Sequence, residues 1–598
     1  MKAIRLHFPR ALFAALFIAC LTVVSALGAD KPAANARQRR PNVIVVLSDD
    51  QGYGDFACLG NPVAKTPNMD KLFSQSVRLT DFHVAPMCTP TRGELMTGLD
   101  ALHSGASSVC AGRSFIRRGI PIMPEIFAAS GYRTAHFGKW HLGNSYPHLP
   151  HQRGFQESVY LLGWGITSLP DVWQNDCFDG RFYHNGVLQE YPGYCTDVWF
   201  DLSMAWIRQQ QAAGEPFFLY LPTNAVHGPH WVAEKYKQPY RDQAQPEFWG
   251  MLANLDENLG RLMTMLDETG LADNTILIYF NDNGGTNGVK IFNAGMRGGK
   301  TTLYDGGHRA ACFIRWPAGG LGAPRDVPEL TEVQDLLPTF IDLCGLKAPA
   351  GAHFDGTSLA GLLKGTSDRL PERMLVVQYG QTPTKGNAAV LWKRWRLVND
   401  TELYDLATDP GQTKNVAAEH ADVVERMREH YNAWWDGVAP KLEDFSPISI
   451  GDDAENPVCM TAVDWMNVYC DNAYDVRNGK TVNAPWSVLV EQEGVYEIAL
   501  RRWPAEADAA ITAAVPEFKA VDGKLPPGKA LPIAAARLKV GEILDETKPV
   551  GPDDKLVSFR VRLDKGAKLP MQSWFLAADG SPVCGAFYAY AKRLPAEK

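Results

Sequence analysis

The residues whose types and spacing most clearly suggest reactivity surround a single cysteine. Cys88 opens the stretch Cys-Thr-Pro-Thr-Arg, in which Pro90 suits the first turn of a helix because its φ is already helical. A side chain at such a helix start faces unpaired backbone N–H groups and the positive end of the helix dipole, which favour an anionic group. Arg92 adds a permanent positive charge one turn later. Taken alone, the stretch fits a buried structural cysteine as well as a reactive one.

A pair of carboxylates follows the first apolar segment of the chain. Residues 42–48 are apolar and β-branched, which is typical of a buried parallel strand, and Asp49 and Asp50 come directly after them. Two adjacent carboxylates repel each other unless a cation neutralises them. An isolated acidic pair is also typical of a solvated turn.

Three further segments predict buried strands that end in polar side chains, namely residues 132–137, 216–221 and 275–280. Helices are expected at 121–130, 199–211, 248–270 and 332–344. Strands that alternate with helices predict an α/β fold with a mostly parallel sheet sandwiched by helices, and ligands bind beyond the carboxyl ends of such strands. The polar residues at these ends are Lys139, His141, His227, Asp282 and Asn283, and Lys300 lies in a later loop. Their convergence at one edge predicts a functional site.

These segments together resemble the type I, formylglycine-dependent sulfatases of the alkaline phosphatase superfamily. The central match is C-x-P-T-R-x-x-L-x-T-G at 88–98, in which Thr91 stands where most members have Ser. The accompanying motifs are NVIVVLSDDQGYGD, GKWHLG, HGP, NDNGG, RGGK and ELYDLxxDP, between Pro41 and about Trp435. The resemblance implies an alkaline-phosphatase-like fold and hydrolysis of a sulfate ester by an arylsulfatase-like or carbohydrate sulfatase.

The resemblance also implies the chemistry of the site. A formylglycine-generating enzyme would oxidise Cys88 to formylglycine, whose hydrate is the nucleophile. The residues placed around one calcium ion are Asp49, Asp50, Asp282, Asn283 and the modified Cys88. Oxygen ligands suit calcium or magnesium, and the absence of Cys and His ligand spacing argues against zinc.

The same resemblance assigns roles to the cationic and imidazole groups. Arg92 would hold the hydrate and the metal site, while Lys139 and Lys300 would grip the sulfate oxygens. His141 would contact the formylglycine and serve as a base, and His227 would protonate the leaving alcohol. The catalytic set is therefore Cys88, Arg92, Lys139, His141, His227 and Lys300.

The N-terminus predicts export. A basic start and an apolar run from 11 to 27 lead into small residues, so residues 1–29 are expected to be a signal peptide. The run is shorter than the roughly 20 residues of a membrane anchor, and we expect a periplasmic or secreted protein with no membrane contact after cleavage. Export permits disulfides among the eleven cysteines, with Cys177/Cys195 and Cys459/Cys470 as plausible local pairs.

Length and texture predict several domains. A chain of 598 residues is long enough to form a large core. Its formal net charge of −8 argues against a nucleic-acid partner. We expect a catalytic α/β domain at 41–365, a small α+β C-terminal subdomain at 366–443 and an appended antiparallel β domain at 444–598. Within the last of these, the Pro- and Ala-rich stretch 515–533 is expected to be a surface excursion.

Two other functions remain open from the sequence. The first is a phosphodiesterase or phosphonate monoester hydrolase of the same superfamily, although the formylglycine-bearing ones tend to follow the late metal aspartate with His, whereas Asn283 follows Asp282 here. The second is a non-catalytic glycan-binding relative, in which Cys88 is never modified. The expected substrate of the sulfatase is a sulfated glycan or a small sulfate ester.

Overall fold

A computed structural model of the chain describes residues 40–596. The expected signal peptide at 1–29 lies outside these residues. Within them, no helix combines the length and the apolar character that crossing a membrane requires.

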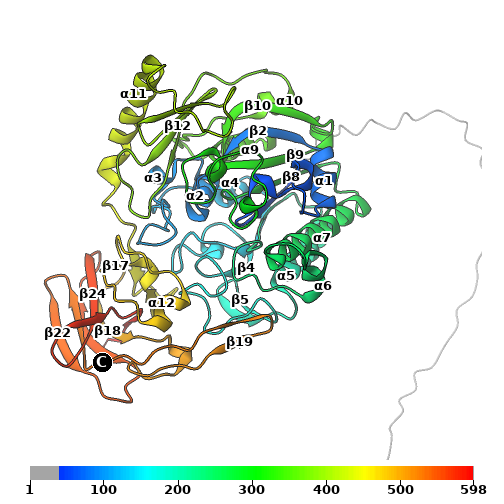
Figure 1. The fold of residues 1–598 in the computed structure, drawn as a ribbon. Coiled ribbons are helices and arrows are strands. Elements are labelled where there is room, and N and C mark those ends of the chain that lie inside the picture. The colour runs from blue at the N-terminus through cyan, green and yellow to red at the C-terminus, as the bar shows by residue number, and fades with distance from the viewer. Residues whose placement is uncertain (1–39, 597–598) are drawn as a thin grey trace, which may run out of the picture. The chain divides into compact units, whose positions relative to one another are not determined.

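The core of the fold is a ten-stranded mixed sheet (Figure 1). The five strands β8, β1, β7, β3 and β4 run parallel to one another. The strands on either side of them pair antiparallel, β9 with β8, β2 with β9 and β5 with β4. In spatial order the strands are β10 (Arg325–Glu332), β2 (Val77–His83), β9 (Arg309–Arg315), β8 (Thr275–Asn281), β1 (Asn42–Ser48), β7 (Phe217–Pro222), β3 (Arg133–Lys139), β4 (Glu157–Leu161), β5 (Arg181–His184) and β6 (Val187–Glu190). The predicted mostly parallel sheet is confirmed for its centre.

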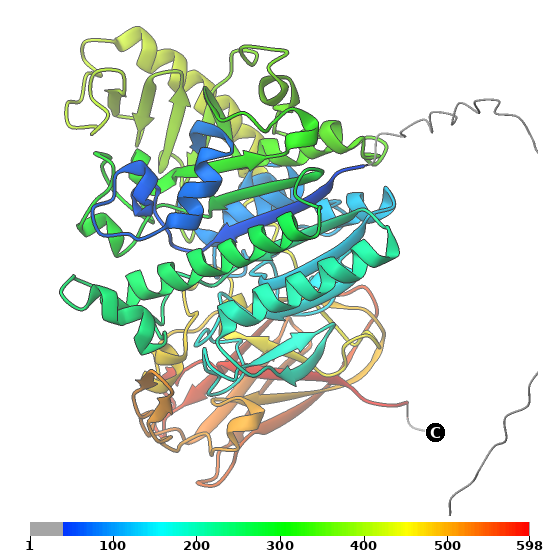
Figure 2. The ribbon, with the colours of Figure 1, turned by 90° about the vertical axis from the view of Figure 1, so that its right-hand side faces the viewer.

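Helices cover both faces of this sheet, as predicted. Ile44 and Val46 of β1 belong to the apolar cluster that contains α5 (Cys195–Ala213) and α7 (Pro246–Glu268), two long helices that cross one face (Figure 2). The alternate β1 residues belong to a second cluster, with α2 (Cys88–Thr97), α4 (Met123–Ala129) and α9 (Leu336–Cys344). Because successive strand residues point to opposite faces, β1 must be apolar throughout to be buried on both sides.

The boundaries of the central elements follow the sequence pattern within a few residues, but some elements had no clear signal. The strand predicted at 275–280 is β8, and the helix predicted at 248–270 is α7. Strands β4, β5 and β6 lie in a stretch with no apolar periodicity. The helix predicted from residue 332 begins at Leu336, because Glu332 still pairs in strand β10 with β2 and Val333–Asp335 form a turn of 3-10 helix.

A small antiparallel sheet follows the large one in sequence. It consists of β11 (Leu375–Gln378), β12 (Ala388–Trp392), β13 (Trp395–Val398) and β14 (Glu402–Asp405). The apolar face of α11 (Ala421–Val438) packs on it through Met427 and Tyr431. Strands β12 and β13 form a hairpin, and Lys393 at its turn adopts the left-handed conformation.

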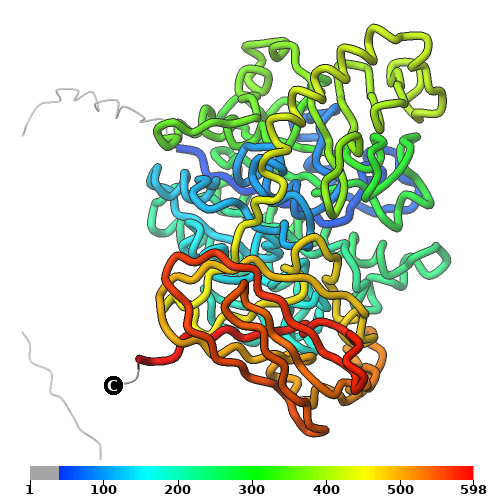
Figure 3. The backbone as a smooth tube through the Cα atoms, turned by 90° about the vertical axis from the view of Figure 1, so that its left-hand side faces the viewer, coloured from blue at the N-terminus to red at the C-terminus, as the bar shows by residue number. Residues whose placement is uncertain are grey.

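The C-terminal β region (residues 448–593) contains two sheets around one shared core (Figure 3). The larger joins β15 (Ile448–Ile450), β17 (Trp486–Val490), β24 (Lys568–Leu576), β21 (Ala535–Val540), β22 (Leu544–Pro549) and β25 (Pro582–Cys584). The smaller joins β16 (Val458–Thr461), β26 (Tyr588–Arg593), β18 (Gly494–Arg501) and β23 (Val557–Leu563). All these pairs are antiparallel except β15 with β17, which is parallel.

The expected surface excursion forms a hairpin arm, β19 (Phe518–Ala520) and β20 (Gly523–Leu525), which Figure 1 shows reaching below β5. Its tip carries Asp522, whose carboxylate accepts from the backbone N–H of Val232 at 2.9 Å and from Lys237 Nζ at 2.6 Å. The arm therefore joins the C-terminal β region to the segment that follows His227.

The cysteines of the described residues are all free thiols. Cys177 and Cys195, one of the two expected pairs, are neighbours, and the Cys195 N–H donates to the Cys177 carbonyl at 2.7 Å. Cys459 and Cys470 are both free, so the expected pair Cys459/Cys470 is not formed here.

Candidate active site

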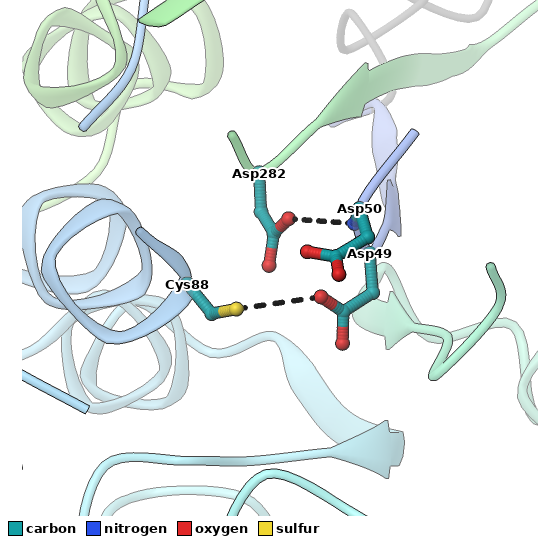
Figure 4. A group of neighbouring side chains, drawn as sticks. All are labelled: Asp49, Asp50, Cys88 and Asp282. Atoms are coloured by element: carbon teal, nitrogen blue, oxygen red, sulfur yellow. Dashed lines mark hydrogen bonds between the residues drawn. The ribbon is translucent and has the colours of Figure 1, made fainter. Parts of the chain in front are cut away.

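The expected site residues converge at the carboxyl edge of the large sheet. The four strands that deliver them, β8, β1, β7 and β3, are consecutive neighbours in the sheet. Backbone bonds hold the loops together just past the strand ends, since Asp282 N donates to Ser48 O at 3.1 Å and Asp49 N donates to Ala225 O at 2.9 Å. Figure 4 shows the resulting cluster of Asp49, Asp50, Cys88 and Asp282. Parallel strands place their carboxyl ends at one edge, which is why residues far apart in sequence meet here.

The cysteine lies at the first turn of α2, as the sequence predicts. Cys88 is 2% exposed, and its Sγ lies 3.4 Å from Asp49 Oδ1, 3.3 Å from Asn283 Oδ1 and 3.5 Å from Lys300 Nζ. The cysteine sulfur therefore sits between two oxygen donors and an ammonium group, in the field of the helix N-terminus.

Each of the three carboxylates is paired with its own cation. Lys139 Nζ lies 2.6 Å from Asp49, Arg92 lies 2.8 Å from Asp282, and Lys300 contacts Asp50. Asn283 also donates to Asp50 Oδ1 at 3.0 Å. Charges this deeply buried are tolerated only when they are paired and hydrogen-bonded.

The donor set fits a hard divalent cation. One ligand atom from each of Asp49, Asp50, Cys88 and Asp282 lies within 4.8 Å of the others. Calcium–oxygen distances are about 2.3–2.6 Å, so donors spaced in this way can surround one central ion. Because the three carboxylates are already balanced by three side-chain cations, an added divalent ion would give the site the positive charge that an anionic substrate needs.

The pKa values of the cluster reflect burial and these pairings. Burial raises the pKa of Asp50, but the Lys300 ammonium and His227 outweigh it and hold this pKa below its usual value. Burial and the neighbouring Asp49 raise the pKa of the Cys88 thiol well above its ordinary value. An unmodified Cys88 is therefore a neutral thiol, which is a weak nucleophile.

The two site histidines differ in which ring nitrogen is left as a hydrogen-bond acceptor. His141 Nε2 lies 3.1 Å from the Val109 carbonyl and His227 Nδ1 lies 2.6 Å from the Gly228 carbonyl. With these ring N–H groups assigned as donors, His141 Nδ1 and His227 Nε2 are left as acceptors. His227 Nε2 is 3.8 Å from Asp50, and burial lowers the pKa of His227 to about 3.

A cavity of about 480 Å³ opens above the cysteine. From the large sheet and its loops it is lined by Cys88, His141, His227, Lys300 and Trp164. Lys139 and Arg92 are fully buried and do not line it; they contact the carboxylates from behind. The site therefore has a charged, buried base and a polar, accessible mouth.

One glycine is required by the close approach of two strands. Gly138 directly precedes Lys139, has a φ of +129° and lies so near β7 that a Cβ would come within 2.0 Å of the Pro222 carbonyl oxygen. Any larger residue would force β3 away from β7 and displace Lys139 from the cluster.

Other histidines do not take part in the cluster. His136 is fully buried among aromatic rings, as packing within a strand predicts. His308 is buried too, and its Nδ1 lies 2.9 Å from His83 Nδ1. His230 contacts Asn287 at 3.4 Å and does not line the cavity.

Sequence reasoning missed the residues that form the outer part of the cavity. The small sheet's neighbourhood contributes Tyr379 and Gln381, and the C-terminal β region contributes Tyr469, Asp471 and Asn472. The only sequence signal for Trp164 was weak: the residue lies in the stretch 144–195, which is rich in aromatic residues and has no regular apolar spacing. Its ring centroid lies 4.9 Å from that of His227. The other five carry no local pattern that separates them from ordinary loop residues.

Comparisons with known proteins agree with this geometry. A sequence model of the sulfatase family matches residues 41–346, and a model described as the C-terminal part of N-sulphoglucosamine sulphohydrolase matches residues 298–434. The first match covers more than half of the chain and includes every residue of the cluster.

Individual relatives give the same result. N-acetylgalactosamine-6-sulfatase of Mus musculus is 28% identical over 67% of this chain and 80% of its own length. Arylsulfatase A of Homo sapiens is 30% identical over 63% of this chain and 83% of its own length. The crystal structure of Ps i-CgsB in complex with k-i-k-neocarrahexaose matches with a TM-score of 0.61 at 24% identity, over 66% of this chain and 92% of that one, which supports the fold.

The buried cluster, the alkaline-phosphatase-like sheet that builds it and the extent of the family match lead to one assignment. This chain belongs to the sulfatase family and is a sulfuric ester hydrolase.

Proposed function

We propose that this protein is an exported, calcium-dependent sulfatase that hydrolyses sulfate monoesters of carbohydrates through a formylglycine derived from Cys88. The observation that carries the proposal is the position of the Cys88 Sγ, at the start of α2 and within 3.5 Å of Asp49, Asn283 and Lys300. A buried neutral thiol at this position is a weak nucleophile. An oxygen nucleophile at the same position would contact both the proposed metal site and the Lys300 ammonium.

The substrate class is supported by the relatives and by the cavity. One relative is named for N-acetylgalactosamine 6-sulfate, and a structural neighbour holds a neocarrahexaose. The cavity mouth, with tryptophan, tyrosine, amide and carboxyl groups, suits a polyol ligand, since sugar hydroxyls need hydrogen bonds and sugar rings pack on aromatic faces.

Two groups complete the proposed machinery. As formylglycine, residue 88 would supply a hydrated aldehyde with a hydroxyl nucleophile. Asp49, Asp50, Asp282 and Asn283 would hold a calcium ion, which would supply Lewis acidity to that hydroxyl and net positive charge to the site.

The cations of the chain hold the nucleophile and the sulfate. Lys300 lies closest to residue 88 within the cavity and binds a sulfate oxygen, which stabilises the charge that develops in the transition state. Arg92 orients Asp282 and donates to the Lys139 carbonyl at 3.1 Å, so it fixes the base of the site. Lys139 neutralises Asp49 and adds positive potential beneath the sulfate.

The histidines move protons. His227 Nδ1 is held by the Gly228 carbonyl, so Nε2 is the nitrogen that delivers a proton to the leaving alcohol, and the anionic sulfate beside the ring favours its protonated form. His141 offers its Nδ1 as the base that deprotonates the second hydroxyl of the hydrate when sulfate is released.

We also propose the domain organisation and location. Residues 41–365 form the catalytic domain, residues 366–443 the C-terminal subdomain and residues 444–598 the appended β domain. The predicted signal peptide at 1–29 directs the chain to the periplasm or the exterior. A formylglycine-generating enzyme acts on Cys88 during maturation.

Two measurements test the proposal. Protein produced together with a formylglycine-generating enzyme is digested, and the peptide that contains Cys88 is expected to have the mass of the aldehyde. The same protein should hydrolyse nitrophenyl sulfate and sulfated sugars far faster than nitrophenyl phosphate or a phosphonate monoester. An unmodified thiol in fully active protein, or a preference for phosphorus esters, would refute it.

A further inference from the structure

The outer wall of the cavity comes from a part of the chain about 380 residues after the nucleophile. Tyr469, Asp471 and Asn472 lie in the C-terminal β region, between the short helix that ends at Asp464 and α12 (Ala473–Asn478). They face the same space as Cys88, His227 and Trp164. The cavity is therefore incomplete without this region.

Hydrogen bonds fix this wall to the catalytic loops. The Asp471 carbonyl accepts from the Leu169 N–H at 2.9 Å and from the Trp164 indole at 3.0 Å. The Ala473 N–H donates to the Thr167 carbonyl at 3.0 Å. These bonds join the wall to the loop whose Trp164 ring packs beside His227.

A second set of bonds ties the same segment to the loop of Val109, which also lines the cavity. The Asn467 N–H donates to the Ala111 carbonyl at 3.1 Å, and Arg113 donates to Asn467 Oδ1 at 2.8 Å. Segment 467–473 is thus held on two sides, so its side chains keep a fixed position relative to the nucleophile.

The charges of the lining are arranged in a simple way. Among the residues that line this cavity in the described part of the chain, Lys300 and Asp471 are the only lysine, arginine, aspartate or glutamate. Lys300 lies at the base, beside Cys88, and Asp471 lies in the wall, beside the Tyr469 phenol and 3.1 Å from the Asn472 amide. The cavity thus offers a cation to one anionic group and a carboxyl with neutral hydrogen-bonding groups to the rest of the ligand.

We infer that Tyr469 and Asp471 of the C-terminal β region are specificity-determining residues that hydrogen-bond the hydroxyl groups of a neutral sugar carrying one sulfate, and that Asp471 disfavours substrates with a second anionic group. This inference rests on the proposed hydrolysis of carbohydrate sulfates. The Asp471 carboxyl already accepts from the Asn472 amide and contacts the Tyr469 phenol, so a sugar hydroxyl would bind the remaining lone pairs of the carboxyl and of the phenol oxygen. A second sulfate or a uronate would approach Asp471 with no further lysine or arginine in the described lining to offset the repulsion.

The test compares substrates rather than activity alone. Wild-type enzyme is assayed on a set of monosulfated neutral hexoses, on a disulfated hexosamine, on a sulfated disaccharide that contains a uronate and on nitrophenyl sulfate. The best neutral hexose sulfate is then used with the variants Asp471→Asn and Tyr469→Phe. Matched controls on the next helix are Asp475→Asn and Tyr474→Phe, which change the same chemical groups outside the cavity.

For Asp471→Asn we expect kcat/KM on the neutral sugar sulfate to fall about 10- to 100-fold, the usual effect of losing a hydrogen bond to a charged group. The kcat/KM of this variant on the disulfated and uronate substrates should fall far less or rise. The ratio of kcat/KM on the neutral sugar sulfate to kcat/KM on these substrates should therefore drop at least about 10-fold. The kcat/KM of Asp471→Asn on nitrophenyl sulfate should change by less than about 3-fold, because this substrate does not contact the wall. The kcat/KM of the control variants on the sugar sulfate should also change by less than about 3-fold, because their substituted side chains lie outside the cavity.

The outcomes separate the two proposals. Wild-type enzyme that cleaves only doubly charged sugars, or variants that lose activity equally on every sulfate, would overturn this inference while the proposed function stands. Wild-type enzyme that cleaves no sugar sulfate, or that cleaves phosphorus esters in preference to sulfates, would instead refute the proposed function.

Discussion

The cluster around Cys88 and the outer wall of the cavity are built in opposite ways. In the cluster, Asp49, Asp50 and Asp282 follow adjacent strands of one sheet, are buried, and each has a cation partner. In the wall, Tyr469 is 42% exposed, and Asp471 belongs to a loop that is docked on the catalytic loops by backbone bonds. The difference separates a buried, charge-paired base, to which we assign the chemistry, from a rim docked through backbone bonds, to which we assign the choice of substrate.

The largest effect is expected at the cysteine. Cys88→Ala should lower sulfatase turnover by about 10⁴-fold or more, because the nucleophile is removed. Folding should be nearly unaffected, since loss of one buried sulfur costs on the order of 1 kcal/mol. Activity on nitrophenyl sulfate and a thermal melt measure the two effects. Cys312→Ala, which removes another buried free thiol, is the control and should retain turnover; comparable losses in both variants would contradict a special role for Cys88.

A smaller but still large effect is expected at the metal cluster. Asp282→Asn removes a proposed calcium ligand and leaves the buried Arg92 with only the more distant Asp49 carboxylate, 3.8 Å away, so calcium affinity should fall by more than about 100-fold and stability by about 3–5 kcal/mol. Activity after chelation and graded return of calcium measures the first effect, and denaturant unfolding measures the second.

The matched control for that variant is Asp335→Asn, which breaks the buried pair of Asp335 with Arg373 outside the site. It should lose stability without a change in the calcium requirement. If activity of the wild-type enzyme survives chelation, or if Asp282→Asn needs no more calcium than wild type, the cluster is not a metal site.

A substitution in the hairpin arm of the C-terminal β region should change kcat only a few-fold. Asp522→Asn weakens the bonds to Val232 and Lys237, which hold the segment after His227. A partly exposed pair of this kind contributes on the order of 1 kcal/mol, so kcat on nitrophenyl sulfate should fall about 2- to 5-fold. Glu517→Gln, which frees Lys524 on the same arm, should leave kcat unchanged; equal effects would mean that the arm acts only on stability.

The smallest effect on activity, and the sharpest electrostatic contrast, is expected at Asp464 of the C-terminal β region. This carboxyl is 5% exposed, its Oδ1 has no hydrogen-bond partner, and burial raises its pKa from 3.8 to about 7. The folded state therefore binds the proton more tightly than the unfolded state. Its stabilising contribution is complete below pH 3.8 and is lost as the pH rises through about 7.

Asp464→Asn keeps the neutral form at every pH, so relative to wild type it should gain stability with rising pH, up to about 4 kcal/mol above pH 7. Denaturant unfolding at pH 5 and pH 8 measures the difference, and activity on nitrophenyl sulfate should not change. A gain that does not grow with pH would show that Asp464 is not protonated in the fold. Asp50, whose pKa is lowered by Lys300, shows the opposite behaviour because it has a cation partner.

Much of the fold was predictable because its central elements carry strong local signals. The strand β1 is a continuous apolar run that a parallel sheet buries on both faces, and α7 places leucines at helical spacing. Strands β4 to β6 were missed because they are only five, four and four residues long, and β6, at the edge of the sheet, is exposed throughout. The hairpin at Lys393 was missed because a two-residue turn interrupts the apolar pattern too briefly to be seen.

The sequence by itself determined the base of the site. Its strands end in Asp49, Asp50, Lys139, His227, Asp282 and Asn283, and a parallel sheet gathers such ends at one edge whatever the details of packing. Only the tertiary structure decided the rim. Tyr469 and Asp471 reach the cavity because a loop of the C-terminal β region docks through backbone carbonyl and amide groups, which every residue has, so no side-chain pattern in the sequence marks the contact.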